Sequence, residues 1–264
     1  MTRIERKFEI LKANNQKALI TYITAGDPDL EVTKQLVLEM ERKGADIIEL
    51  GIPYSDPVAD GPVIQRAAQR ALSKKIKIKN IMDMVREIRK ETQIPLLYLL
   101  YFNCMLQYGI EKFISECSEA GIDGLIIPDL PYEESKDVKD IAARYNVNII
   151  SLIAPTSTGR IKKIAQDAKG FIYCVSSTGV TGTREQFKTN FYEFMEEIKK
   201  YSDTPKAIGF GISSPEQAKE IKNYCEGVIV GSAIVRIIED YNQSSEVIDK
   251  IGEFVSQLKA ALNR

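Results

Sequence analysis

Short apolar runs alternate along the chain with longer segments of helical period. The runs are rich in β-branched residues and leucine, and each spans four to six residues, which is typical of strands buried on both faces of a parallel sheet. Eight such runs occur, at residues 18–23, 47–50, 96–101, 124–127, 148–153, 171–175, 206–210 and 227–230. We therefore predict eight parallel strands.

The segments between these runs carry an apolar stripe opposite a charged face, as amphipathic helices do. They lie at residues 31–43, 81–90, 110–120, 133–145 and 215–224. Strand followed by helix, repeated about eight times within roughly 250 residues, predicts an α/β fold of the closed (βα)8 TIM-barrel class. A doubly wound open sheet is the alternative. We expect an extra N-terminal helix at about residues 4–13 and a C-terminal helix at about 247–262 to plug or cover the barrel, and residues 1–264 to form a single (βα)8 barrel domain.

The composition excludes several kinds of chemistry but says little about the fold. The chain has 36 Lys and Arg against 37 Asp and Glu, a balance that argues against a nucleic-acid surface. It contains no histidine, so proton transfer near neutral pH must fall to Asp, Glu, Tyr, Lys or Cys. The four cysteines include no C-x-x-C pair, so we expect no structural metal site. With neither a signal peptide nor a membrane-spanning stretch in the sequence, we expect a cytoplasmic protein with reduced thiols.

Residues 48–61, IELGIPYSDPVADG, place three carboxylates in and just after the second predicted strand. An apolar run normally excludes a carboxylate such as Glu49, because burying an unpaired charge is costly. The prolines and final glycine of the following loop make it stiff enough to hold Asp56 and Asp60 in defined positions. Catalytic groups of (βα)8 barrels lie at the carboxyl ends of strands, where Glu49 is found and where Tyr173 of the sixth strand faces inward. A salt bridge in the core is the alternative for Glu49, and simple packing is the alternative for Tyr173.

Glycine-rich segments follow the last three predicted strands, at residues 176–182, 209–215 and 231–233. Their backbone N–H groups, together with the N-terminus of a helix beginning at residue 232 or 233, suit a phosphate monoester. The loops after the seventh and eighth strands are the usual phosphate grip of such barrels. The alternative is that these glycines serve turn geometry alone.

Taken together, these residues resemble one family, the α subunit of tryptophan synthase. The match is carried by residues 48–61, 24–28, 124–131, 179–182, 209–213 and 230–233, and it spans nearly the whole chain. The resemblance implies retro-aldol cleavage of indole-3-glycerol phosphate to indole and glyceraldehyde 3-phosphate, with no metal or organic cofactor in this chain. It implies that Glu49 is the general acid and base, that Asp60 accepts the indole N–H, and that Tyr173 assists orientation near Glu49.

The resemblance also implies which residues contact the substrate. The indole ring would lie among Tyr22, Leu99, Ile126 and Ile153, with Phe210 as a further contact. The phosphate would sit on Gly182, Gly211, Gly231 and Ser232. Residues 176–188 resemble the family's mobile lid, and we expect Thr181 to couple this lid to Asp60. Tyr22 departs from the Phe that the family often has, which would alter the indole pocket slightly.

The partner implied by the resemblance is a β subunit that carries pyridoxal phosphate, in an α2β2 assembly that passes indole between subunits. Pro53 and Asp56 match positions that meet this partner, so ligands of the β subunit could bias loop closure. Two alternatives stay open. One is an autonomous lyase that releases free indole, and the other is a non-catalytic allosteric subunit. The presence of Glu49, Asp60 and three glycine loops argues against the second.

Overall fold

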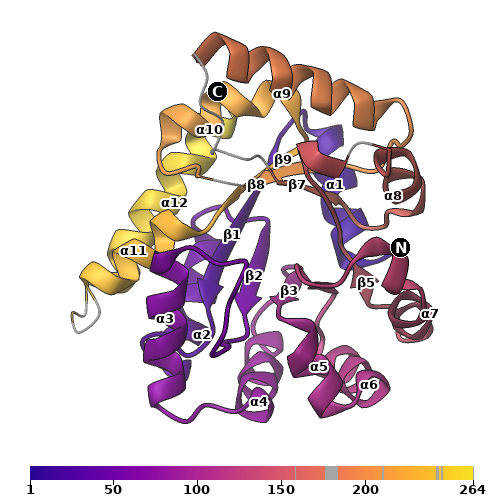
Figure 1. Ribbon diagram of the computed structural model, residues 1–264. Helices are drawn as coiled ribbons and strands as arrows, with labels where there is room; N and C mark the ends of the chain where they lie inside the picture. The colour runs from indigo at the N-terminus through magenta and orange to yellow at the C-terminus, as the bar shows by residue number, and fades with distance from the viewer. Residues whose placement is uncertain (158, 176–183, 210, 242–243, 245, 264) are drawn as a thin grey trace.

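The strands of the computed structural model form one parallel sheet, which the helices surround (Figure 1). The structure describes residues 1–157, 159–175, 184–209, 211–241, 244 and 246–263, without the side chains of residues 184–191. Within these ranges the strands are β1 (Ala18–Thr24), β2 (Ile47–Gly51), β3 (Leu96–Leu99), β4 (Gly124–Ile126), β5 (Asn148–Ile149), β6 (Ser151–Ile153), β7 (Ile172–Val175), β8 (Lys206–Gly209) and β9 (Gly227–Val230). Each predicted strand is therefore present, with ends within two residues of the prediction.

The sheet closes at residues 148–153. The strand order is β5-β4-β3-β2-β1-β9-β8-β7-β6, so β5 and β6 lie at its two ends. These two strands are consecutive in the chain, with Ile150 alone between them. β5 pairs with β4, β6 pairs with β7, and the Ile150 N–H donates to the Leu125 carbonyl oxygen at 2.9 Å. One chain segment thus joins both ends of the sheet, which confirms the (βα)8 barrel and excludes the open sheet.

The helices of the described residues lie around and below the strands. Their bounds are α1 (Arg3–Ala13), α2 (Leu30–Arg42), α3 (Pro62–Ser73), α4 (Ile78–Arg89), α5 (Phe102–Tyr108), α6 (Ile110–Ala120), α7 (Lys136–Arg144), α8 (Ile161–Asp167), α9 (Arg184–Lys199), α10 (Pro215–Ile221), α11 (Ser232–Asp240) and α12 (Val247–Asn263). Three short 3-10 helices lie in connections between strands and helices: η1 (Tyr132–Glu134), η2 (Pro155–Ser157) and η3 (Lys222–Tyr224). In the part of the chain that is described, no helix is both long and apolar enough to cross a membrane.

Sequence patterning predicted α2, α4, α6, α7 and α10 but not α3, α5, α8 or α9. The sequence of α3 nevertheless contains two features that indicate a helix. Pro62 occupies its first turn, where the fixed φ of proline suits a helix and its missing N–H costs nothing. Its buried face then follows the helical period, with Val63, Ile64, Ala67, Ala68 and Ala71.

The predicted plug is α1. Thr2 caps this helix, because its Oγ1 accepts from the Glu5 N–H at 3.3 Å while its own N–H donates to the Glu5 carboxylate at 2.9 Å. The buried residues of α1 pack against the inward side chains near the starts of the strands, in a cluster made of Ile4, Phe8, Leu11, Ala18, Ile20, Ile47, Leu97, Ile126, Ile150, Phe171, Ala207 and Ile229. The amino-terminal end of the barrel is therefore filled by apolar side chains.

The C-terminal helix has a different place. α12 packs against α2, α10 and α11 in the outer layer, and in Figure 1 it runs in yellow beside α10 and α11. Its buried residues, among them Ile251, Val255 and Leu258, belong to the larger core between sheet and helices. α12 therefore covers the outside of the barrel, and α1 alone of the two terminal helices plugs it.

Removing the aromatic ring of Phe8 tests whether α1 plugs the barrel. Phe8 is 5% exposed and its ring centroid lies 5.9 Å from that of Phe171. We expect Phe8→Ala to lower the free energy of unfolding by about 3–5 kcal/mol, because it leaves a cavity at the barrel floor. Urea titration measures this loss. Ile10→Ala on the same helix, at a position 49% exposed, is the control and should change stability by no more than about 0.5 kcal/mol; equal losses would contradict the plug.

Candidate active site

The inward positions near the carboxyl ends of the strands carry an acid and two tyrosines. Alternate residues of a strand face the same side, so Glu49 follows Ile47 into the barrel and Tyr173 follows Phe171. Tyr22 lies opposite Glu49 in the β1–β2 register. Above the apolar floor, the barrel therefore holds ionisable side chains that face one another.

Glu49 is fully buried, and within the described part of the chain its carboxylate has no hydrogen-bond partner. Its side chain is 0% exposed, and the lack of a partner applies to both carboxylate oxygens. Burial raises the pKa of this carboxyl from 4.5 to about 8, because the charged form is poorly solvated there. Glu49 is therefore protonated at neutral pH, and the alternative of a salt-bridged core carboxylate finds no counterpart in the part of the chain described.

The two tyrosines stand over glycines that leave room for their rings. A Cβ atom on Gly51 would lie 2.7 Å from Tyr22 Cζ, and one on Gly209 would lie 2.6 Å from Tyr173 Cζ, closer than side chains pack. The Tyr22 hydroxyl lies 3.3 Å from the Thr24 hydroxyl. Burial raises the pKa of the Tyr173 hydroxyl well above its usual value, and the nearby carboxylates of Glu49 and Asp60 raise it further. Tyr173 therefore lies within electrostatic range of both predicted catalytic acids, and its role in orienting the substrate stays a prediction.

The loop after β2 holds Asp60 through contacts with the end of β3. The Ala59 N–H donates to the Tyr101 hydroxyl at 2.9 Å, and the Tyr101 ring stacks on Tyr54 with centroids 5.1 Å apart. Asn103 Nδ2 donates to the Tyr54 hydroxyl at 3.0 Å. Asp60 is half-buried, and its pKa is raised by burial, with a partly offsetting hydrogen bond from Tyr101. The stiffness predicted for this loop thus comes from aromatic contacts as well as from its prolines.

An apolar roof over the strand ends comes from two helices. Tyr22 packs with Val63, Ile64 and Ala67 of α3 and with Val235 of α11, and Leu99 adjoins this cluster. Leu99 also touches the inner barrel cluster, so it links the floor to the roof. The predictions named Tyr22 and Leu99 but missed the helical residues, since α3 was not predicted.

The other predicted apolar contacts lie deeper or on the other side of the sheet. Ile126 is fully buried in the inner cluster. Ile153 belongs to the outer core between sheet and helices, whereas its neighbour Leu152 packs against the inner cluster. The alternation of strand β6 therefore directs Leu152, not Ile153, toward the barrel interior.

The predicted phosphate loops are described in part. Gly211 has φ +66°, a left-handed conformation that favours glycine, and it is exposed. Gly231 lies against Tyr22 and precedes α11, whose first residue Ser232 is exposed. Three further predicted contacts, Thr181, Gly182 and Phe210, lie outside the described residues, as do residues 176–183 of the predicted lid.

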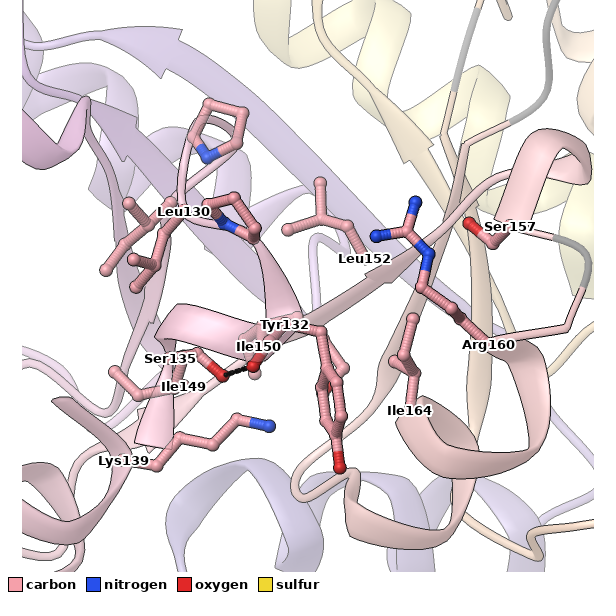
Figure 2. Close-up of a pocket in the computed structure, with 14 residues that line it drawn as sticks. Leu130, Tyr132, Ser135, Lys139, Ile149, Ile150, Leu152, Ser157, Arg160 and Ile164 are labelled. Atoms are coloured by element: carbon pink, nitrogen blue, oxygen red, sulfur yellow. Dashed lines mark hydrogen bonds between the residues drawn. The ribbon is translucent and has the colours of Figure 1, made fainter. Parts of the chain in front are cut away.

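A cavity of about 170 Å³ lies beside the barrel, between the ends of β4 and β6 and the helices α7 and α8 (Figure 2). It forms where pairing across the junction of the sheet stops, since the β4–β5 ladder ends at Ile149 and β6 pairs only with β7 among the described strands. Figure 2 shows Lys139 next to the Tyr132 ring, with its Nζ 4.5 Å from the ring centroid. Glu49, Asp60 and Tyr173 do not line this cavity. The acid–base groups instead lie at the carboxyl end of the barrel interior.

These observations define the chain as a (βα)8-barrel protein with a buried acid and two tyrosines near the carboxyl ends of its strands. The family model described as "Tryptophan synthase alpha chain" matches residues 8–263. The chain is 56% identical to the tryptophan synthase alpha chain of Thermoanaerobacter sp. (strain X514) over 99% of its own length and 100% of that protein. It is 53% identical to that of Clostridium kluyveri, again over 99% and 100%.

Solved structures agree. The alpha chain from Legionella pneumophila superposes with a TM-score of 0.91 at 38% identity, covering 100% of this chain and 98% of the other. A chain of Mycobacterium tuberculosis tryptophan synthase gives a TM-score of 0.89 at 33% identity, covering 100% and 99%. The chain belongs to the tryptophan synthase alpha chain family. This is a family of lyases of the tryptophan pathway, in which pyridoxal phosphate is carried by the β subunit.

The raised pKa of Glu49 makes stability depend on pH. In the unfolded chain this carboxyl ionises near 4.5, whereas in the folded chain it stays protonated to about 8. Between these values the folded state binds one more proton, so its stability falls as pH rises, by at most about 1.4 kcal/mol per pH unit. Glu49→Gln has no such ionisation. Urea unfolding at pH 5.5 and 7.5 should therefore show the Gln variant gaining on the wild type at the higher pH; a constant difference would contradict the buried neutral acid.

Proposed function

We propose that the chain cleaves indole-3-glycerol phosphate to indole and glyceraldehyde 3-phosphate by a retro-aldol reaction. The observation that carries this proposal is Glu49, a fully buried and unpartnered carboxyl with a pKa of about 8 at the carboxyl end of a barrel strand. A group of that pKa can donate a proton at neutral pH and take one back. Both actions are required when the bond between indole C3 and the glycerol chain breaks.

The protons balance on Glu49. Its neutral carboxyl protonates indole C3, which places positive charge on the ring nitrogen. The resulting carboxylate then takes the proton of the hydroxyl on the adjacent carbon. As that C–O bond becomes the aldehyde carbonyl, the C–C bond electrons return to the indole ring, and Glu49 ends protonated as it began. The low polarity around Glu49 supports both steps, because neither form of the acid is locked by a permanent partner.

Asp60 stabilises the cation by accepting the indole N–H. It is half-buried on a loop that Tyr101 and Tyr54 hold in place, so its charge is fixed before the substrate arrives. Preorganised charge of this kind lowers a barrier by about 3–4 kcal/mol. Tyr173, whose hydroxyl lies in the field of both acids, orients the substrate near Glu49.

The remainder of the substrate fits the surrounding elements. The indole ring lies between Tyr22, Leu99 and the roof residues Ile64 and Val235, with Leu152 as the inward residue of β6. The phosphate is bound by Gly211, Gly231 and Ser232, where the first N–H groups of α11 are free of helical partners. Ile126, Thr181, Gly182 and Phe210 remain predicted contacts from the sequence, whereas Leu152 takes the place that was predicted for Ile153.

A partner β subunit with pyridoxal phosphate receives the indole in an α2β2 assembly. The loop proposed to meet it exposes Asp56 and the apolar Val58, which is 87% exposed, while Pro53 is buried beneath them. Leu106 of the neighbouring α5 is 56% exposed. Exposed apolar side chains on the loop and on α5, which contacts the loop through Asn103 and Tyr54, favour a partner surface there. The cytoplasmic location remains a prediction from the sequence.

Turnover of indole-3-glycerol phosphate tests the proposal, with release of glyceraldehyde 3-phosphate as the measurement. We expect slow turnover by the chain alone and a rise when a β subunit is added. Glu49→Gln should lower kcat by at least about 10²–10⁴-fold because it removes the proton donor. Asp60→Asn should lower it by about 10²–10³-fold because it removes the charge that faces the cation.

Each other result has a definite meaning. Fast turnover that ignores the β subunit would favour the autonomous lyase. No turnover with or without the partner would favour the non-catalytic subunit. Wild-type turnover in Glu49→Gln would remove the acid–base assignment even if the reaction is right. Asp83→Asn on the exposed face of α4 serves as the carboxylate control, and its kcat should be unchanged.

A further inference from the structure

A chain of ion pairs joins three elements at the mouth of the barrel. Arg70 of α3 donates from Nε and Nη2 to the two carboxylate oxygens of Asp27, at 2.8 and 2.7 Å. Its Nη1 donates to Glu239 of α11 at 2.8 Å. Glu239 also accepts from Nε and Nη2 of Arg66, both at 2.7 Å. A single guanidinium thus ties the loop after β1 to α3 and to α11.

This network is more than a surface salt bridge. Asp27 is 0% exposed, while the side chains of Arg70 and Glu239 are 22% and 25% exposed. Bidentate pairing with a planar guanidinium fixes direction as well as distance, which a flexible ammonium group does not. Hydrogen bonds from Arg66 in particular hold the pKa of Glu239 near 2, so the network stays charged across the physiological range.

The two helices that the network joins begin on opposite sides of the proposed substrate. α3 starts at Pro62, one residue after the pair Asp60 and Gly61, and α11 starts at Ser232. Their N-terminal halves meet through Val63 and Val235 in the roof. Arg70 and Glu239 lie in the C-terminal halves, so the ion pairs join the two helices at a second point along their length.

We propose that Arg70 and Glu239 are positioning residues, which fix the spacing between the indole-binding end of the site at Asp60 and the phosphate-binding end at α11. This inference rests on the proposed function, since it assigns one end of the substrate to each helix. The affinity of a ligand that must reach both ends depends on this spacing. The affinity of a ligand that occupies only the phosphate end does not.

Two ligands, tested first on one variant, separate binding to both ends of the site from binding to the phosphate end alone. An indole joined at C3 to a phosphate by a three-carbon chain without hydroxyl groups spans both ends and cannot react. Glycerol 3-phosphate occupies the phosphate end alone. We expect Glu239→Ala in the full chain to raise the Kd of the spanning ligand by about 10-fold or more, because small misplacements of binding groups are costly, and to change the Kd of glycerol 3-phosphate by less than about twofold. Isothermal titration calorimetry measures both.

Glu239→Ala leaves the buried Asp27–Arg70 pair intact, so it preserves the interaction on which folding depends most. Arg70→Lys is the second variant. A lysine keeps the charge but cannot pair with Asp27 by two bonds and with Glu239 at once, so it should show the same selective loss. Glu87→Ala, which breaks the exposed pair with Lys90 on α4, is the matched control and should alter neither Kd.

The ratio of the two Kd values decides the question. A loss of affinity that is equal for both ligands means that the network supports the fold or the phosphate loop only, which overturns the proposal. Unchanged affinity for both also overturns it. If the wild type itself fails to bind the spanning ligand, the proposed function fails first. Selective loss in both variants, with an unchanged control, supports the positioning role.

Discussion

Residues 148–153 take part in two hydrogen-bond ladders, one at each end of the sheet, and so close the sheet into a barrel. The inward direction of the side chains on the strands depends on this closure. The segment pairs with β4 through its first half and with β7 through its second half, so it connects the two ends of the sheet. Closure sorts the inward residues into layers. The lower layer is apolar and is sealed by α1. Polar groups therefore find room only at the carboxyl ends, where the acid and the tyrosines gather.

That arrangement costs folding free energy at Glu49, because its carboxyl is buried and has no hydrogen-bond partner among the described residues. Because the surroundings are apolar, the group stays protonated, and the same feature that weakens the folded state at higher pH makes it a proton donor at neutral pH. Asp60 differs because its loop leaves it half-buried and Tyr101 donates to it. Burial raises the pKa of both carboxyl groups, and for Asp60 a hydrogen bond from Tyr101 offsets part of that rise.

The sequence was a good guide wherever one physical cause dominated. Buried parallel strands produce continuous apolar runs, so their positions were predicted within two residues. Glu49 was singled out because a carboxylate within such a run is anomalous, and Asp60 was singled out by the stiff loop that holds it and by the family resemblance. The side of β6 that Ile153 faces depends on closure at Ile150, which no local pattern reveals. The pairing of Arg70 with Asp27 and with Glu239 joins positions far apart in the chain, and each of these residues alone resembles an ordinary surface charge.

The glycines beneath the tyrosines limit how this site can diverge. Gly51 and Tyr22 occupy one shared volume, and so do Gly209 and Tyr173. A phenylalanine at position 22 would not free position 51, because the ring carbon Cζ is already too close for a Cβ atom. A larger residue at either glycine therefore requires the ring above it to shift or to be replaced, so each pair can change only together.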